Sequence, residues 1–198
     1  LTSADDEKPY DGTALTNDTV TVSGDGFVGN EGVICDVTGK QVNAGESDNT
    51  FSYVLNGNTK AQNYTIAKKE GTLKVTPTDK KVTVTITGHT GGEKYSGKEQ
   101  TVSGYDVSSI SSKLYTAKDF EFTGTAEVKG TDAESYQMGL KASNFKNISK
   151  NFTNVEFVVI DGHLDIAKRK VTLTSANDEK PYDGTALTND TVTVSGDG

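Results

Sequence analysis

Three tyrosine-containing triplets are the strongest candidates for chemistry in this 198-residue sequence. Tyr10-Asp11-Gly12 recurs as Tyr182-Asp183-Gly184, and the related triplet Tyr95-Ser96-Gly97 lies between them. An aromatic ring beside a hydrogen-bonding side chain can hold a sugar, which makes Tyr10, Asp11 and Tyr95 candidate binding residues. The alternative is a turn, in which Asp or Ser bonds its own backbone and Gly12 and Gly97 supply a positive φ. Since Asp changes to Ser while Tyr and Gly persist, the sequence favours the turn.

No set of residues predicts catalysis or metal binding. His89 lies in a glycine-rich loop and His163 on an expected strand, and the two lack the short spacing of a zinc-binding pair. Neither accompanies a recognisable nucleophile motif. The acidic run Asp5-Asp6-Glu7 lacks the regular ligand spacing and closing glutamate of a calcium loop. We therefore expect a protein that is not an enzyme, with no catalytic residues, no bound metal and no cofactor.

Charge and hydropathy exclude two classes of partner. The formal net charge is -8, so a nucleic acid, which is bound mainly through neutralised phosphates, is not an expected partner. No apolar run approaches the ~18 residues of a membrane-spanning helix, so we expect no membrane insertion in this chain. Abundant Thr, Val, Gly, Asn and Asp favour short strands and turns over helices, which predicts a mostly β fold.

A long repeat organises the chain. Residues 173–198 repeat residues 1–26 with a single difference, Asn177 in place of Asp5, so the repeat offset is 172 residues. Because the chain opens at Leu1 rather than Met and ends inside a repeat, we expect it to be part of a longer protein built from such units.

A weaker repeat lies within that unit at an offset of 85 residues, where Leu1 matches Ile86 and Cys35 matches Phe120. Phe51, Tyr53 and Leu55 match Tyr136, Met138 and Leu140, and the offset then grows to 91 residues, so that Tyr64 matches Val155. Cys35, the single cysteine, is therefore expected to be a core residue. We predict a repeat domain over 1–78, a second over 79–167, and an incomplete start of a further first-type repeat over 168–198; these are called copy A, copy B and the third segment.

Alternating residues indicate the strands. Val82 to Thr87 alternates cleanly and predicts the first strand of copy B. Asp161-Gly162 is a hairpin signal, and Glu70-Gly71 stands at the matching place in copy A. About six short strands in each copy suit either a small β-grasp-like domain or a small immunoglobulin-like β-sandwich.

The order of the motifs resembles that of the YDG and MBG repeat families, the mucin-binding-like β-grasp modules of bacterial cell-surface proteins. The resemblance is carried by Lys-Val-Thr-Leu-Thr at 170–174, the Tyr-Asp-Gly triplets, Asn63-Tyr64-Thr65-Ile66 and Gly71-Thr72-Leu73-Lys74-Val75. Copy B departs from it at Ser96. The resemblance implies tandem β-grasp-like domains in a secreted, extracellular protein held at the cell wall or cell surface.

Two functions follow as expectations. The first is a non-catalytic structural stalk or adhesin repeat, since near-identical units let length vary by recombination. The second is an adhesion module that binds host glycans or mucin, with each repeat adding avidity. In addition, segment 170–198 is too short to bury a core of its own. We therefore predict strand exchange between chains, in which residues 170–198 dock on copy A of a neighbouring chain.

Overall fold

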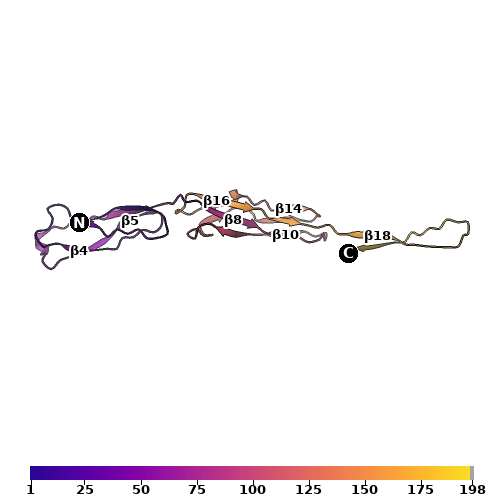
Figure 1. Cartoon of the computed structure of the whole chain (residues 1–198), viewed down its shortest axis with the longest axis horizontal. Coiled ribbons are helices and arrows are strands. Elements are labelled where there is room, and N and C mark those ends of the chain that lie inside the picture. Colours follow the sequence, from indigo (N-terminus) through magenta and orange to yellow (C-terminus); the bar gives the residue numbers. More distant parts are fainter. Residues whose placement is uncertain (197–198) are drawn as a thin grey trace. The chain divides into compact units, whose positions relative to one another are not determined.

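The computed structural model describes residues 1–196, which form many short β-strands (Figure 1). Strands make up 44% of the chain and helix 3%, so the prediction of a mostly β fold is confirmed. The helical residues are two single 3-10 turns, η1 (Ala61–Asn63) and η2 (Ala142–Asn144). Asp197 and Gly198, the last residues of the predicted third segment, lie outside the described residues.

The chain forms two compact units. The first unit contains Leu1–Val84, Ser109–Phe122 and Phe145–Val158, and the second contains Thr85–Ser108, Thr123–Asn144 and Val159–Gly198. The first unit therefore combines all of copy A with three segments of copy B, 79–84, 109–122 and 145–158. Units and sequence copies are different divisions of the chain, and the copy boundaries at 78 and 167 stay predictions.

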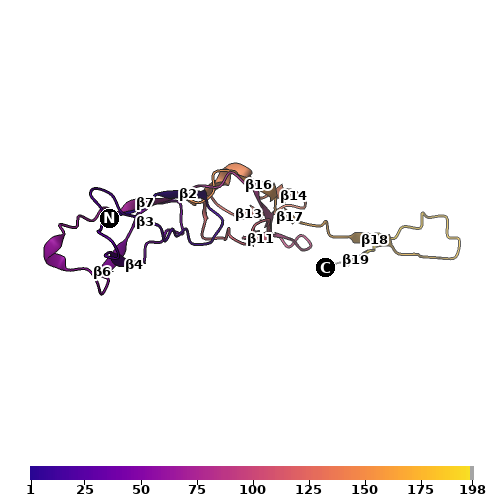
Figure 2. The ribbon, with the colours of Figure 1, turned by 60° about the vertical axis from the view of Figure 1, so that its left-hand side comes forward.

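Copy A is built around one three-stranded sheet and two strand pairs. In the sheet, β7 (Gly71–Thr76) lies between β2 (Asp6–Pro9), to which it is parallel, and β5 (Gly45–Asn49), to which it is antiparallel. The antiparallel pairs are β1 (Thr2–Ser3) with β3 (Val20–Thr21), and β4 (Val33–Val37) with β6 (Phe51–Leu55). Figure 2 shows β4 and β6 together, with β2 and β7 beyond them.

Copy B repeats the arrangement of copy A and adds strands to it. Its strand β17 (His163–Asp165) lies between β9 (Thr90–Gly91), which is parallel, and β14 (Ser135–Gln137), which is antiparallel. A second three-stranded sheet has the order β11 (Tyr105–Ile110), β8 (Val82–Gly88), β16 (Val155–Ile160). The two remaining sheets are pairs, β10 (Gln100–Ser103) with β13 (Glu127–Gly130) and β12 (Phe120–Phe122) with β15 (Phe145–Asn147).

Strand register corrects one part of the internal alignment. Leu73 of β7 pairs with Ser47, whereas its counterpart Leu164 of β17 pairs with Tyr136. Tyr136 is thus the structural equivalent of Ser47, not of Phe51 as the sequence pattern indicated. The pattern was misleading because copy B carries extra residues on both sides of β14, and alternating apolar residues look the same after a shift of two.

Buried residues alternate with more exposed ones along two strands, β7 and β8. Every second residue of β7 is buried, namely Gly71, Leu73 and Val75. In β8 the buried set is Val82, Val84, Ile86 and Gly88, and the threonines between them are only half-buried. Such alternation places one face of each strand in the core and the other toward solvent.

The third segment forms a hairpin of β18 (Val171–Ser175) and β19 (Val192–Gly196) (Figure 1). Its register is that of copy A: Thr174 pairs with Thr193 as Thr2 pairs with Thr21. All residues from 171 to 196 are exposed except Lys180. The hairpin thus adopts the local pairing of copy A without a core around it.

Candidate functional site

The Tyr-Asp-Gly segment of copy A forms a hydrogen-bonded turn at the end of β2. The Asp11 carboxylate accepts bonds from the backbone amide and the hydroxyl of Thr13, at 2.8 and 2.7 Å, and from Lys8 Nζ at 2.8 Å. Gly12 has a φ of +82°, a conformation that side chains disfavour. The same contacts recur among Lys180, Asp183 and Thr185 of the third segment. The turn is therefore determined by its local sequence.

These bonds also set the electrostatics of the turn. The Lys8 ammonium, followed by the hydroxyl and amide of Thr13, holds the pKa of the Asp11 carboxyl well below its ordinary value. Lys180 and Thr185 lower the pKa of Asp183 in the same way. All three donors bond Oδ1 of Asp11, so this oxygen is used within the turn itself.

Tyr10 lies between the core of copy A and an aromatic cluster of the first unit. Its ring packs against Leu15, Leu73 and Val75, and its amide donates to the Thr76 carbonyl at 2.8 Å. The ring also meets Phe152 edge to face, at 5.4 Å between centroids. Tyr10 is thus used in packing, with its ring only half exposed.

The ring of Phe152 also packs against the ring of Tyr115. The two rings meet at 5.3 Å and 84°, and Phe152 is 4% exposed. The Tyr115 hydroxyl donates to the Asp119 carbonyl, with the Asn147 side-chain oxygen also 3.0 Å away, and burial together with the Asp119 charge raises the Tyr115 pKa to about 12. Copy A and segments 109–122 and 145–158 are therefore joined through packed aromatic rings, of which Phe152 and Tyr115 are buried.

The matching turn of copy B keeps the geometry with serine in place of aspartate. Ser96 Oγ accepts the Lys98 amide at 3.4 Å, as Asp11 accepts that of Thr13, and Gly97 has a φ of +70°. The Tyr95 amide donates to the Ala167 carbonyl at 2.8 Å. Tyr95 is 38% exposed and Tyr182 is 98% exposed. Of the candidate binding residues, Tyr95 therefore has the more accessible ring.

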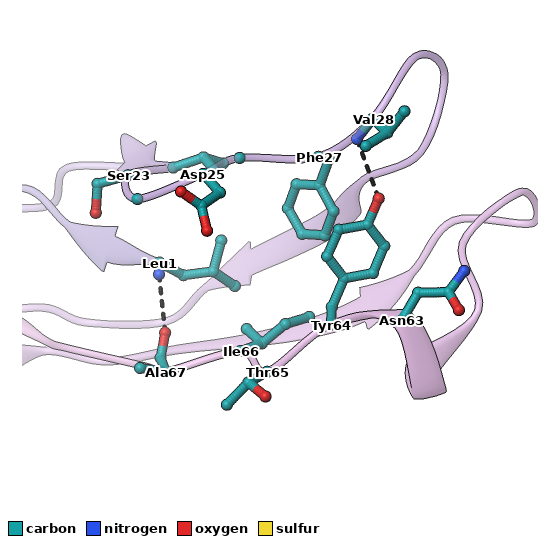
Figure 3. Close-up of a pocket in the computed structure, with 13 residues that line it drawn as sticks. Leu1, Ser23, Asp25, Phe27, Val28, Asn63, Tyr64, Thr65, Ile66 and Ala67 are labelled. Carbon is teal, nitrogen blue, oxygen red and sulfur yellow. Dashed lines mark hydrogen bonds between the residues drawn. The ribbon is translucent and has the colours of Figure 1, made fainter.

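An open groove of about 590 Å³ lies in the first unit, and no motif of the sequence pointed to it (Figure 3). Its walls are two segments without strand pairing, 22–28 and 63–67, and Leu1 stands between them. The Leu1 ammonium donates to the Ala67 carbonyl at 2.8 Å. The signal that could have revealed the groove is the match of Leu1 with Ile86, which lies within a seven-residue strand of copy B.

Aromatic residues close one end of the groove (Figure 3). Phe27 and Tyr64 pack with their ring centroids 4.9 Å apart. The Tyr64 hydroxyl accepts the Val28 amide at 3.0 Å and donates to the Glu31 carboxylate, and this second bond raises the Tyr64 pKa. The groove thus has an aromatic end held by hydrogen bonds, and the acidic Asp25 lies on one wall.

The remaining candidates lie apart from one another. His89 contacts Asp106, His163 contacts Asp165, and Cys35 is half-buried on β4. Among residues 1–196, no group of three or more His, Cys, Asp or Glu side chains is arranged to hold a metal ion. No helix in that range is long and apolar enough to cross a membrane.

Comparison with known proteins gives no match: no family model, no curated protein and no solved structure is similar to this chain. The resemblance to bacterial surface repeats therefore depends on the motifs alone.

Proposed function

We propose that this chain is a non-catalytic structural repeat, a stalk or adhesin repeat, of a secreted bacterial cell-surface protein. The observation that carries the proposal is the near-identity of residues 1–26 and 173–198, which also share strand register and turn hydrogen bonds. A sequence that forms the same local structure twice is suited to serial addition of units. The packing of Tyr10, Phe152 and Tyr115 further supports a mechanical role, because the Tyr-Asp-Gly turn contributes to cohesion.

For the fold of each copy we propose the β-grasp-like arrangement, with the immunoglobulin-like sandwich as the alternative. Support comes from the parallel pairing of an early with a late strand, β2 with β7 and β9 with β17. Sandwiches of the immunoglobulin type are built from antiparallel sheets. The absence of an α-helix between residues 1 and 196 favours the sandwich instead.

The second candidate function is binding of host glycans or mucin. The exposed ring of Tyr95 supports it, since an accessible aromatic face is what a sugar ring stacks on. Tyr182 is a further exposed candidate ring on the third segment.

Both functions can be tested together. Small-angle X-ray scattering is measured on chains with one, two and three of the 172-residue units, and the same proteins are applied to immobilised mucin and a glycan array. A stalk predicts a constant increase of the maximum dimension per added unit and no saturable binding. Saturable binding that Tyr95→Ala abolishes and Lys98→Ala leaves intact would make the chain an adhesion module. A maximum dimension that does not grow with unit number would contradict the stalk.

A further inference from the structure

The linker between the two copies, residues 76–80, is bonded to copy B at its centre. The Thr78 amide donates to the Asn151 carbonyl at 2.9 Å, and the Thr78 carbonyl accepts the Thr153 amide at 3.1 Å. The Thr153 hydroxyl donates to the same carbonyl, also at 3.1 Å. Thr78 is only 4% exposed, so it lies within the folded structure. A linker held in this way differs from the exposed, flexible segments that usually separate domains.

The loop that holds the linker is residues 148–154, between β15 and β16, and we call it the joint loop. The side chain of its Asn151 also bonds a loop of copy A, because Oδ1 accepts the Ala44 amide at 2.7 Å and Nδ2 donates to Asn43 Oδ1 at 3.1 Å. Asn151 thus bonds the linker with its backbone and copy A with both ends of its side-chain amide. An amide whose donor and acceptor are both satisfied by copy A fixes the position of the joint loop.

Phe152, the next residue of the joint loop, is covered from both copies. Tyr10 meets its ring edge to face from copy A, and Tyr115 does so from copy B, at 5.4 and 5.3 Å between centroids. Phe152 is therefore buried although it lies in a loop. Movement of copy A away from the joint loop would expose this ring to water, and the cost of that exposure disfavours an open junction.

The Tyr-Asp-Gly turn makes a second contact with copy B at Gly12. A Cβ at this position would lie 2.6 Å from Leu114 Cδ2, so Leu114 packs on the side of Gly12 that a side chain would occupy. Tyr and Gly are the two residues that persist in all three triplets, and Tyr10 and Gly12 are the two that contact copy B. The variable residue, Asp11, bonds within the turn.

We infer that the Tyr-Asp-Gly turn of copy A is a docking surface for copy B, and that the joint loop makes the connection between the copies a stiff joint instead of a hinge. All of these contacts lie within the first compact unit. The inference goes beyond the proposed function, because it concerns how two neighbouring copies are held and applies equally to a stalk and to an adhesion module.

The internal repeat shows that the fold of one copy does not require Phe152. In copy A, β6 pairs with β4 as β15 pairs with β12, so the loop that follows β6 takes the place of the joint loop. Residues 56–63 of that loop contain no aromatic side chain. They bond their own copy instead, since Asn56 Nδ2 donates to the Asn30 carbonyl at 3.1 Å. The contact with Tyr10 therefore gives Phe152 a role that a single copy does not supply.

Distances between spin labels, measured by pulsed electron paramagnetic resonance, report whether the joint moves. The labels are attached to Asp48→Cys in β5 and Lys118→Cys in copy B, both exposed, in the full chain with Cys35→Ser. A stiff joint predicts one narrow distance distribution. Phe152→Ala should broaden it, because the ring that both copies cover is removed. A broad distribution in the protein with Phe152 intact would show a hinge and overturn the inference.

A matched control separates docking from general stability. Phe145→Ala removes a ring of nearly equal burial, 5% exposed, whose partners Phe120, Phe122 and Phe157 all belong to copy B. It should leave the distribution narrow at a temperature where circular dichroism shows the protein to be folded. Equal broadening by Phe145→Ala and Phe152→Ala would assign the effect to stability and overturn the inference.

A second substitution tests the joint without changing its aromatic rings. Asn151→Ala removes the side-chain bonds to Asn43 and to the Ala44 amide but keeps the backbone bond to Thr78. We expect it to broaden the distribution less than Phe152→Ala does. No broadening from either substitution would show that copy A is held without the joint loop, which also overturns the inference.

Discussion

Asp11 shows how a residue suited to chemistry can instead serve its own turn. It accepts bonds from Lys8 and Thr13, and Asp183 repeats them with Lys180 and Thr185 in a segment without a core. The exchange of Asp for Ser between the copies was sufficient to predict this turn, because both side chains can bond an amide two residues on. The packing of Tyr10 on Phe152 could not be predicted, since nothing in either local sequence relates residues so far apart.

Titration of the two aspartates tests this account. Their folded-state pKa values are depressed from the ordinary 3.8, so the contribution of each turn to stability is present above that value and lost as the pH falls through the folded pKa. We expect Lys8→Met to move the Asp11 pKa upward, because the Lys8 bond is its largest cause, while Asp183 stays unchanged as the internal control. Carboxyl carbon chemical shifts measured by NMR against pH would report both. If the Asp11 pKa does not change in Lys8→Met, Lys8 has no such role.

At the scale of elements, the alternating strands were predictable and their partners were not. The strand around Val82 to Thr87 was correctly expected from its alternation, and it is β8. The counterpart of Tyr136 was misassigned by four positions, since register depends on hydrogen bonds to β17 that apolar spacing does not specify. The groove was missed for a related reason: its two walls, 22–28 and 63–67, lie far apart in the sequence and carry no motif.

Close backbone contact at Gly71 provides a test of the sheet of copy A. A Cβ added to Gly71 would lie 2.4 Å from the Ser3 carbonyl oxygen, a backbone atom that cannot rotate away. Gly71→Ala should therefore separate β1 from the start of β7 and expose the Gly71 amide and the Ser3 hydroxyl, which bond each other at 2.9 Å. We expect a loss of about 1–3 kcal/mol in the free energy of unfolding, the usual cost of buried polar groups left without partners.

Urea denaturation monitored by circular dichroism would measure the loss. Gly57→Ala is the matched control, because no atom lies within 4 Å of a Cβ at Gly57. If both variants unfold at the same urea concentration, the close approach of β7 to Ser3 does not constrain the sheet.

At the scale of the whole molecule, the repeated sequence occurs in two surroundings, once packed within copy A and once in the exposed hairpin of the third segment. Ser3 is 1% exposed and bonds Asn49 and Gly71, whereas Ser175 is exposed in a hairpin of the same register. Leu15 is 7% exposed and its counterpart Leu187 is 47% exposed. Any difference in stability between the two segments must therefore come from the surrounding core, because their local propensities are the same.

Amide hydrogen exchange, read by mass spectrometry, can isolate that difference. The intrinsic exchange rates of 1–24 and 173–196 are almost equal because their sequences differ at one position, so each segment is the control for the other. In dilute solution we expect slow exchange in β1 and β3 and fast exchange in β18 and β19, since two strands without a packed face open readily. Equal protection of both segments would show that this hairpin is stable without the core of copy A.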